Sequence, residues 1–132
     1  MNASGSFDVK LEPQKVDNPQ AEAASIGRLS IHKKFQGAID GVSNGEMLAR
    51  RDDQQNGAYV ALERVTGSLN GRNGSFVLMH SAVMMGGVPA NWSVAVVPGS
   101  GTEQLAGLSG TMKITIDDSG HGYDFQYTLP ES

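Results

Sequence analysis

Apolar and polar residues alternate along most of this chain, in short segments separated by glycine-rich breaks. The alternation is most regular in five segments, at residues 6–12, 28–35, 92–96, 111–117 and 123–129. A period of two places every second side chain on the same face of a β-strand, so each segment predicts a strand with one buried face. In the second segment, Lys33 alone interrupts the apolar series of Leu29, Ile31 and Phe35.

Glycine and proline divide the chain at intervals of roughly ten residues, a spacing typical of all-β sandwiches and barrels. Asn-Gly and Ser-Gly pairs tolerate the positive φ of tight turns, and five of them predict turns: Asn44-Gly45, Asn56-Gly57, Asn70-Gly71, Asn73-Gly74 and Ser119-Gly120. We therefore expect about eight strands, near residues 4–12, 26–36, 45–52, 57–68, 74–84, 90–97, 109–117 and 121–129. Residues 14–25 and 98–107 are expected to be irregular, with one helical turn each.

Successive hairpins with one apolar face each favour an all-β fold, a closed antiparallel barrel of about eight strands, because closure removes exposed strand edges. A two-sheet β-sandwich is the alternative, because alternation alone does not distinguish the two architectures. The chain has 132 residues, a length that suits a single domain over residues 1–132.

Composition and charge argue against several kinds of partner and chemistry. The net charge is −4 and no basic cluster is larger than a pair such as Lys33-Lys34, so we expect no nucleic-acid partner. The apolar runs are too short to span a membrane and the first residues show no leader pattern, so we expect a cytoplasmic protein without a membrane partner. The chain has no cysteine, and its three histidines lack metal-ligand spacing, so no metal and no cofactor are predicted.

Two stretches of the chain resemble a known family. They are RDDQQNGAYVALERVTGSLNGRNGSFVLMHS at residues 51–81 and VVPGSGTEQLAGLSG at residues 96–110, with Gly86-Gly87 and Trp92 between them. They resemble a bacterial domain-of-unknown-function family with an allene oxide cyclase-like barrel. The resemblance implies an eight-stranded antiparallel barrel that associates into homo-oligomers. It implies no activity, because the family is uncharacterised and no motif places the catalytic residues of allene oxide cyclase on this sequence.

The hairpin of residues 59–69 and 74–84 contains the candidate catalytic residues, Glu63 and His80. If its loop has an even number of residues, six side chains share one face: Tyr59, Glu63, Val65, Phe76, Leu78 and His80. A carboxylate and an imidazole among large apolar neighbours can serve as general base and acid. The opposite face, with Val60, Leu62, Val77 and Met79, is also apolar. If that face is the interior, Glu63 and His80 lie outside, and Arg64, Thr66 and Ser81 are the polar interior groups.

Other residues allow both a functional and a structural interpretation. Glu63 can be a buried structural carboxylate, paired with an arginine such as Arg50 or hydrogen-bonded to the backbone. Trp92, the only tryptophan, opens a predicted strand and can either pack in the core or form the wall of a ligand site. His32 and His121 are expected on the solvated surface.

Two functions fit a barrel of this size, and the sequence leaves open whether the protein is an enzyme. The first is binding of a small, largely apolar molecule, with isomerase-like or cyclase-like chemistry. In this chemistry Glu63 is the base and His80 or Tyr59 orients the bound molecule. The expected ligand-binding residues are Tyr59, Glu63, Phe76, Leu78, His80 and Trp92. The second is a non-catalytic barrel with a filled core, which assembles through its apolar outer strands.

Overall fold

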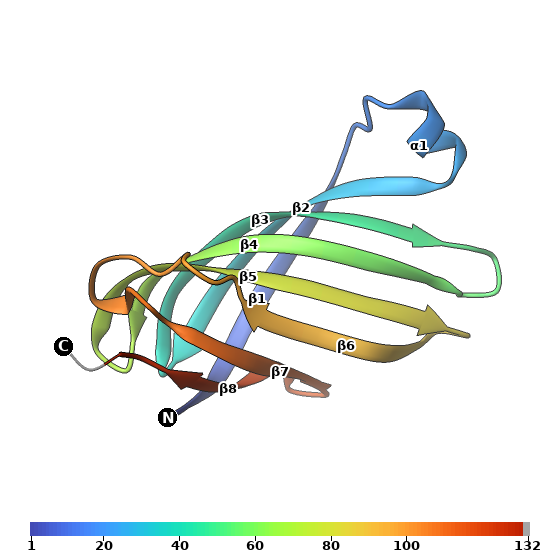
Figure 1. Cartoon of the computed structure of the whole chain (residues 1–132). Helices are drawn as coiled ribbons and strands as arrows, with labels where there is room; N and C mark the ends of the chain where they lie inside the picture. The colour runs from blue at the N-terminus through green and yellow to red at the C-terminus, as the bar shows by residue number, and fades with distance from the viewer. Residues whose placement is uncertain (131–132) are drawn as a thin grey trace.

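The computed structural model describes residues 1–130, in which eight antiparallel strands form a closed barrel in sequence order (Figure 1). The barrel expected from the sequence is confirmed, and the sheet does not divide into the two layers of a sandwich. The strands are β1 (Asn2–Gln14), β2 (Ile26–Gly37), β3 (Ile39–Arg51), β4 (Gly57–Leu69), β5 (Arg72–Met85), β6 (Val88–Val96), β7 (Ser109–Asp117) and β8 (Gly120–Thr128). Two short helices, α1 (Pro19–Ala23) and the 3-10 helix η1 (Glu103–Leu105), occupy the expected irregular segments.

Two of the expected turns are wrong. Asn44-Gly45 lies inside β3, which begins at Ile39 rather than near residue 45, and Asn73-Gly74 lies inside β5. β3 pairs with β4 along its whole length, and this continuous ladder of hydrogen bonds outweighs the local turn preference of an Asn-Gly pair. Asn70-Gly71 does form a turn, with φ values of 47° and 85° at its two residues. Such a turn matches the twist of the strands that it joins.

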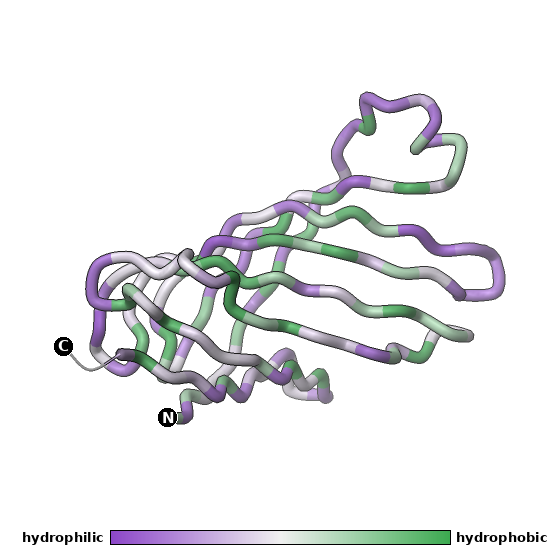
Figure 2. Tube along the Cα trace, in the orientation of Figure 1, coloured by the Kyte–Doolittle hydropathy of each residue, from purple (hydrophilic) through white to green (hydrophobic). Residues whose placement is uncertain are grey.

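Large buried side chains fill the interior near the end of the barrel where both chain termini lie. The rings of Phe76 and Phe125 stack there with their centroids 5.9 Å apart. Leu105 and Leu108, in and after η1, are 1% and 2% exposed and close this end. Figure 2 shows the alternation of hydrophobic and hydrophilic residues along the strands that places such side chains inside. We call this half of the molecule the closed end.

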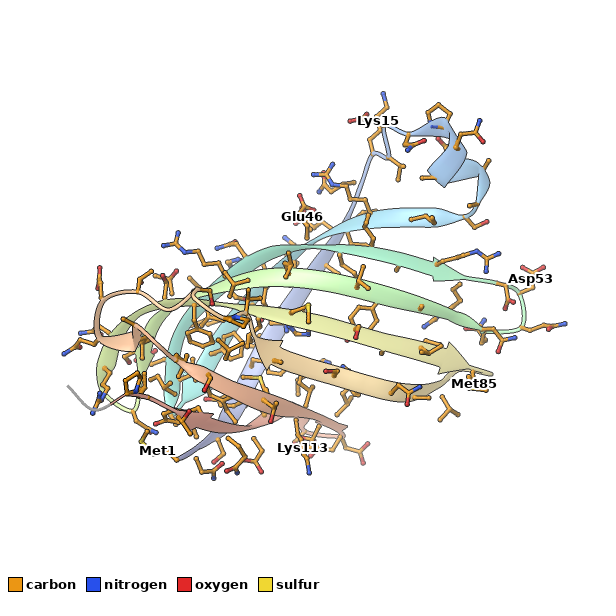
Figure 3. The ribbon with its side chains drawn as sticks, viewed as in Figure 1. Met1, Lys15, Glu46, Asp53, Met85 and Lys113 are labelled. Atoms are coloured by element: carbon orange, nitrogen blue, oxygen red, sulfur yellow. The ribbon has the colours of Figure 1, made fainter. Side chains whose placement is uncertain are left out.

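The opposite end, which we call the open end, is formed by the connections β1–β2, β3–β4, β5–β6 and β7–β8. Asp53, between β3 and β4, and Met85, at the end of β5, both lie there (Figure 3). β6 and β7 share the single residue pair Ala95 and Thr111, so the wall is least continuous between these strands. Among residues 1–130, no helix has the length and apolar character needed to cross a membrane.

Candidate functional site

The β4–β5 hairpin places the predicted site residues inside the barrel. Leu69 pairs with Arg72, so the loop has two residues, and Glu63 stands opposite Leu78. Side chains of opposite parity therefore share a face, which decides the question that the sequence left open. The other face points outward, because Val60, Leu62 and Met79 are more than half exposed.

Glu63 lies at the centre of a buried cluster of three ionisable groups from three strands. Its Oε2 atom is 2.9 Å from Nζ of Lys33 on β2 and 3.1 Å from Nε2 of His80 on β5. The side chain of Glu63 has no exposed surface, whereas Lys33 is 8% and His80 5% exposed. Charged side chains are seldom buried unless they are paired, and here one carboxylate pairs with both nitrogens.

Small residues on β3 allow Glu63 to reach Lys33. β3 lies between β2 and β4, and in the register Ile31, Gly45 and Glu63 form one row across the three strands. A Cβ atom on Gly45 would lie 2.6 Å from Cα of Glu63, so no larger residue fits at this position. Ser43, the partner of Lys33 on β3, is also small and fully buried. The Glu63 side chain therefore crosses over β3 and contacts Lys33 on β2.

The electrostatics of the cluster favour an ionised Glu63. Burial by itself raises the pKa of the Glu63 carboxyl, but the close imidazole of His80 and the ammonium of Lys33 outweigh burial and hold this pKa below its ordinary value. Among residues 1–130, both Glu63 oxygens and His80 Nε2 are buried without a hydrogen-bond partner, although Oε2 is in ion-pair contact with Lys33 and His80. Buried polar atoms without partners require an explanation such as a ligand or a water molecule.

A cavity of about 190 Å³ extends from this cluster toward the open end. Its rim includes Leu11, Trp92 and Ile116, which are 44%, 38% and 64% exposed, so the cavity opens to solvent. The other residues that line it, from β1, β2, β3, β4, β5, β7 and β8, are Phe7, Val9, Ile31, Lys33, Met47, Tyr59, Ala61, Glu63, His80, Ile114 and His121. The cavity wall is thus mainly apolar, with the charged cluster at the inner end.

The structure brings only some of the predicted ligand-binding residues to this cavity. Tyr59 and Trp92 line it beside Glu63 and His80. Burial raises the pKa of the Tyr59 hydroxyl, as does the nearby charge of Glu63, while Trp92 opposes the shift. Phe76 and Leu78 do not line the cavity. They are 2% and 0% exposed and belong to the packed core, because they lie farther along β5 toward the closed end.

Sequence reasoning missed two ionisable residues of the cavity. Lys33 was treated as an interruption of an apolar strand, but it faces inward in the same alternation as Ile31 and Phe35. A lysine in an otherwise apolar inward series was therefore the available signal. His121 was expected on the surface, yet it lines the cavity with its ring 5.1 Å from that of Phe7.

Two further expectations are corrected by the structure. Arg50 does not pair with Glu63, because it lies on the outer face of β3, where its Nε donates to the carbonyl of Ala24 at 2.8 Å. Trp92 does not open its strand but lies within β6, which begins at Val88. His32 lies on the exposed surface as expected, with Nδ1 2.9 Å from the side-chain oxygen of Asn44.

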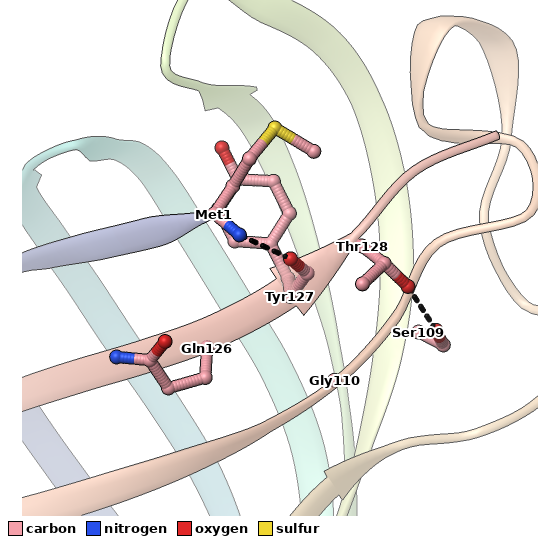
Figure 4. A pocket seen from close by; sticks show the side chains of 6 residues that line it. All are labelled: Met1, Ser109, Gly110, Gln126, Tyr127 and Thr128. Atoms are coloured by element: carbon pink, nitrogen blue, oxygen red, sulfur yellow. Dashed lines mark hydrogen bonds between the residues drawn. The ribbon is translucent and has the colours of Figure 1, made fainter. Parts of the chain in front are cut away.

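Three other hollows lack a comparable arrangement, and one of them, of about 510 Å³, lies beside the β1–β2 connection at Lys15 and Glu22. A second, of about 240 Å³, lies at the closed end beside Met1 and Tyr127 (Figure 4). Its polar groups are already partnered, since the Met1 amino group donates to the Tyr127 carbonyl at 2.9 Å and the Ser109 and Thr128 hydroxyls are 2.7 Å apart. The third, of about 570 Å³, is a depression on the outer face of β3, β4 and β5.

The comparisons with known proteins agree with the fold and describe no function. The model of a family described as "Protein of unknown function (DUF3224)" matches residues 3–127. The chain is also similar to a crystal structure titled as a protein with unknown function from the DUF3224 family of Shewanella oneidensis MR-1. The two are 37% identical with a TM-score of 0.88, over 100% of this chain and 98% of that chain. No curated protein matches the chain.

Proposed function

This chain belongs to the DUF3224 family, whose description names no function, so we propose one from the barrel interior. The protein binds a small, largely apolar molecule in the cavity above Lys33, Glu63 and His80. One observation carries this proposal. A solvent-connected apolar cavity ends on buried ionisable side chains whose hydrogen-bonding capacity is not filled. Ligand sites combine a mainly apolar wall with a few polar groups that fix orientation.

The size of the cavity limits the ligand to about one ring with short substituents. A buried apolar cavity of about 150 Å³ can hold benzene, and this cavity measures about 190 Å³. The aromatic rings of Phe7, Tyr59 and Trp92 would contact the apolar body of the ligand. Its polar group would point inward, toward Lys33 and His80.

The roles within the cluster follow from exposure. Glu63 has no exposed side-chain surface, so a ligand reaches Lys33 and His80 before it reaches the carboxylate. In our proposal Glu63 is therefore a positioning residue for both, and not the base in direct contact with the ligand. This exchanges the roles that sequence reasoning assigned to Glu63 and His80.

Fluorescence of Trp92 tests the proposal directly, because the chain has one tryptophan and it lies at the rim. We expect toluene, phenol, benzoate or cyclohexanone to change the emission of Trp92 in a saturable way and to raise the melting temperature. Ala61→Phe should abolish both effects, since Ala61 is 5% exposed and lines the cavity. Ala58→Phe, on the exposed face of the same strand, is the matched control. If no probe gives a response, or if both variants respond like the wild type, the proposal is wrong.

A second candidate function is assembly with further copies of this chain through the outer face of the sheet. The support is a group of exposed apolar side chains on β3, β4 and β5, namely Leu48, Val60, Leu62, Met79 and Val83. Contiguous apolar surface of this kind marks interaction sites. The strands beneath it are paired on both sides, so a partner would pack against side chains and would not add a strand.

Native mass spectrometry tests the assembly. We expect the wild type to form a discrete oligomer and Leu62→Lys to form monomers, because a lysine charge in the centre of the contact loses its hydration. Thr66→Lys, also exposed on β4 but outside the apolar group, should leave the oligomer intact. A monomeric wild type would exclude this function and would leave the ligand proposal unaffected.

A further inference from the structure

We propose that the cavity takes a small apolar ketone or aldehyde and that His80 and Lys33 catalyse proton transfer at the carbon next to its carbonyl group. The inference rests on the proposed ligand site and adds a substrate class and a reaction. It depends on one observation: the Glu63 carboxylate contacts both the Lys33 ammonium and the His80 imidazole at the inner end of an apolar cavity.

Lys33 provides the group that would bind the carbonyl oxygen. Its Nζ contacts Glu63 Oε2 at 2.9 Å and lies 4.8 Å from the ring centroid of Phe7. An ammonium has three donors, and one carboxylate contact does not use them all. A cationic donor in an apolar site stabilises the negative charge that an enolate oxygen develops. Glu63 fixes the position of this donor before the ligand arrives.

His80 provides the group that would accept the proton. Its Nε2 faces Glu63 Oε2 at 3.1 Å, and a carboxylate at that position favours the tautomer with its proton on Nε2. In this tautomer the lone pair that would accept the proton is on Nδ1. Because Lys33 and His80 contact the same oxygen atom, the donor and the base lie close together and their relative position is fixed.

The reaction is balanced without a further reactant. The imidazole of His80 takes a proton from the carbon next to the carbonyl, and the electron pair of that C–H bond forms the C=C bond of the enolate. The carbonyl oxygen takes the negative charge and is stabilised by the Lys33 ammonium. The imidazolium then returns its proton to the same carbon, or to another carbon of a conjugated ligand, and the second outcome is an isomerisation.

Hydrogen–deuterium exchange tests this step. With cyclohexanone in D₂O, the protons next to the carbonyl should exchange faster with the wild-type protein than without protein, as measured by proton NMR. His80→Gln should reduce the catalysed rate by about 100-fold or more, while Trp92 fluorescence still detects cyclohexanone binding. His32→Gln, an exposed histidine on the same strand as Lys33, should leave the rate unchanged.

The variants of the two adjacent lysines test the oxygen-binding group. Lys33→Met should lower the exchange rate, whereas Lys34→Met should not, because Lys34 is on the exposed face of β2.

If His80→Gln or Lys33→Met does not fold, the comparison of the wild type with Ala61→Phe still decides the outcome, because the filled cavity should not catalyse exchange. Binding of cyclohexanone without faster exchange overturns this inference and leaves the binding function standing. If cyclohexanone does not bind but another probe does, the ketone class is excluded.

Discussion

Gly45 on β3 faces Glu63 on β4 so closely that a Cβ on Gly45 would lie 2.6 Å from Cα and 2.7 Å from Cβ of Glu63. This approach lets the Glu63 side chain pass over β3 and contact Lys33 on β2, at 2.9 Å. Neighbouring strands are about 4.8 Å apart, so an ion pair between strands that are not neighbours requires a gap in the strand between them. Gly45 is that gap, and it gives the cluster its geometry.

Gly45→Ala should therefore destabilise the protein. An added methyl group would collide with the backbone of Leu62 and Glu63, and overpacking of this kind costs about 1–3 kcal/mol of the free energy of unfolding. Urea unfolding measures the effect. Gly27→Ala on β2 is the matched control, since its Cβ would meet no atom closer than 3.8 Å. Equal losses in the two variants would show that intolerance of alanine is not specific to the contact with Glu63.

Breaking the buried ion pair from one side should cost more than removing both charges. Lys33→Met leaves the Glu63 carboxylate with His80 alone, and loss of one partner of a buried pair costs about 3–5 kcal/mol. The double variant Lys33→Met/Glu63→Leu should recover most of this loss, because no uncompensated charge remains. Chemical denaturation of both variants measures the difference, and Lys34→Met should be close to the wild type. A double variant less stable than Lys33→Met would contradict the interpretation.

The protein should lose stability in acid through Glu63. The pKa of this carboxyl is lower in the folded state than its ordinary value of 4.5, so the ionised form stabilises the fold. The contribution is complete above pH 4.5 and is lost as the pH falls through the lower folded-state pKa. The urea concentration at the midpoint of unfolding should therefore decrease as the pH is lowered below 4.5. The decrease should be smaller in Lys33→Met/Glu63→Leu. If the wild type and the double variant lose the same stability as the pH falls, ionised Glu63 does not stabilise the fold.

Tyr123 should stabilise the closed end through its hydroxyl group. The hydroxyl accepts from the Ile39 backbone N–H at 2.9 Å and donates to the Gln36 carbonyl at 2.8 Å, where the chain passes from β2 to β3. Tyr123→Phe leaves the buried N–H without this acceptor, which costs about 1–3 kcal/mol. Tyr127→Phe is the comparison, because its partner Asn70 is exposed and can bond to water. We expect the larger loss of thermal stability in Tyr123→Phe.

The sequence by itself determined the strands and the face that each one buries. Side chains at every second position of a strand share a face, so Phe7, Ile31 and Phe125 could be assigned to the interior without coordinates. The short loop at Asn70-Gly71 also fixed which side chains of β4 lie opposite which side chains of β5. These features are local, since each depends on residues close together in the chain.

Only the tertiary structure decided which polar residues meet and where the cavity lies. Lys33 is 30 positions from Glu63, and their contact depends on the register of β3 against both neighbouring strands and on the absence of a side chain at Gly45. The cavity is formed where residues from every strand converge at the open end, whereas Phe76 and Leu78, on the same inward face as His80, fill the core. Alternation specifies inside or outside for each side chain, but it does not specify depth along the barrel. Depth depends on strand stagger and closure, which are properties of the whole sheet.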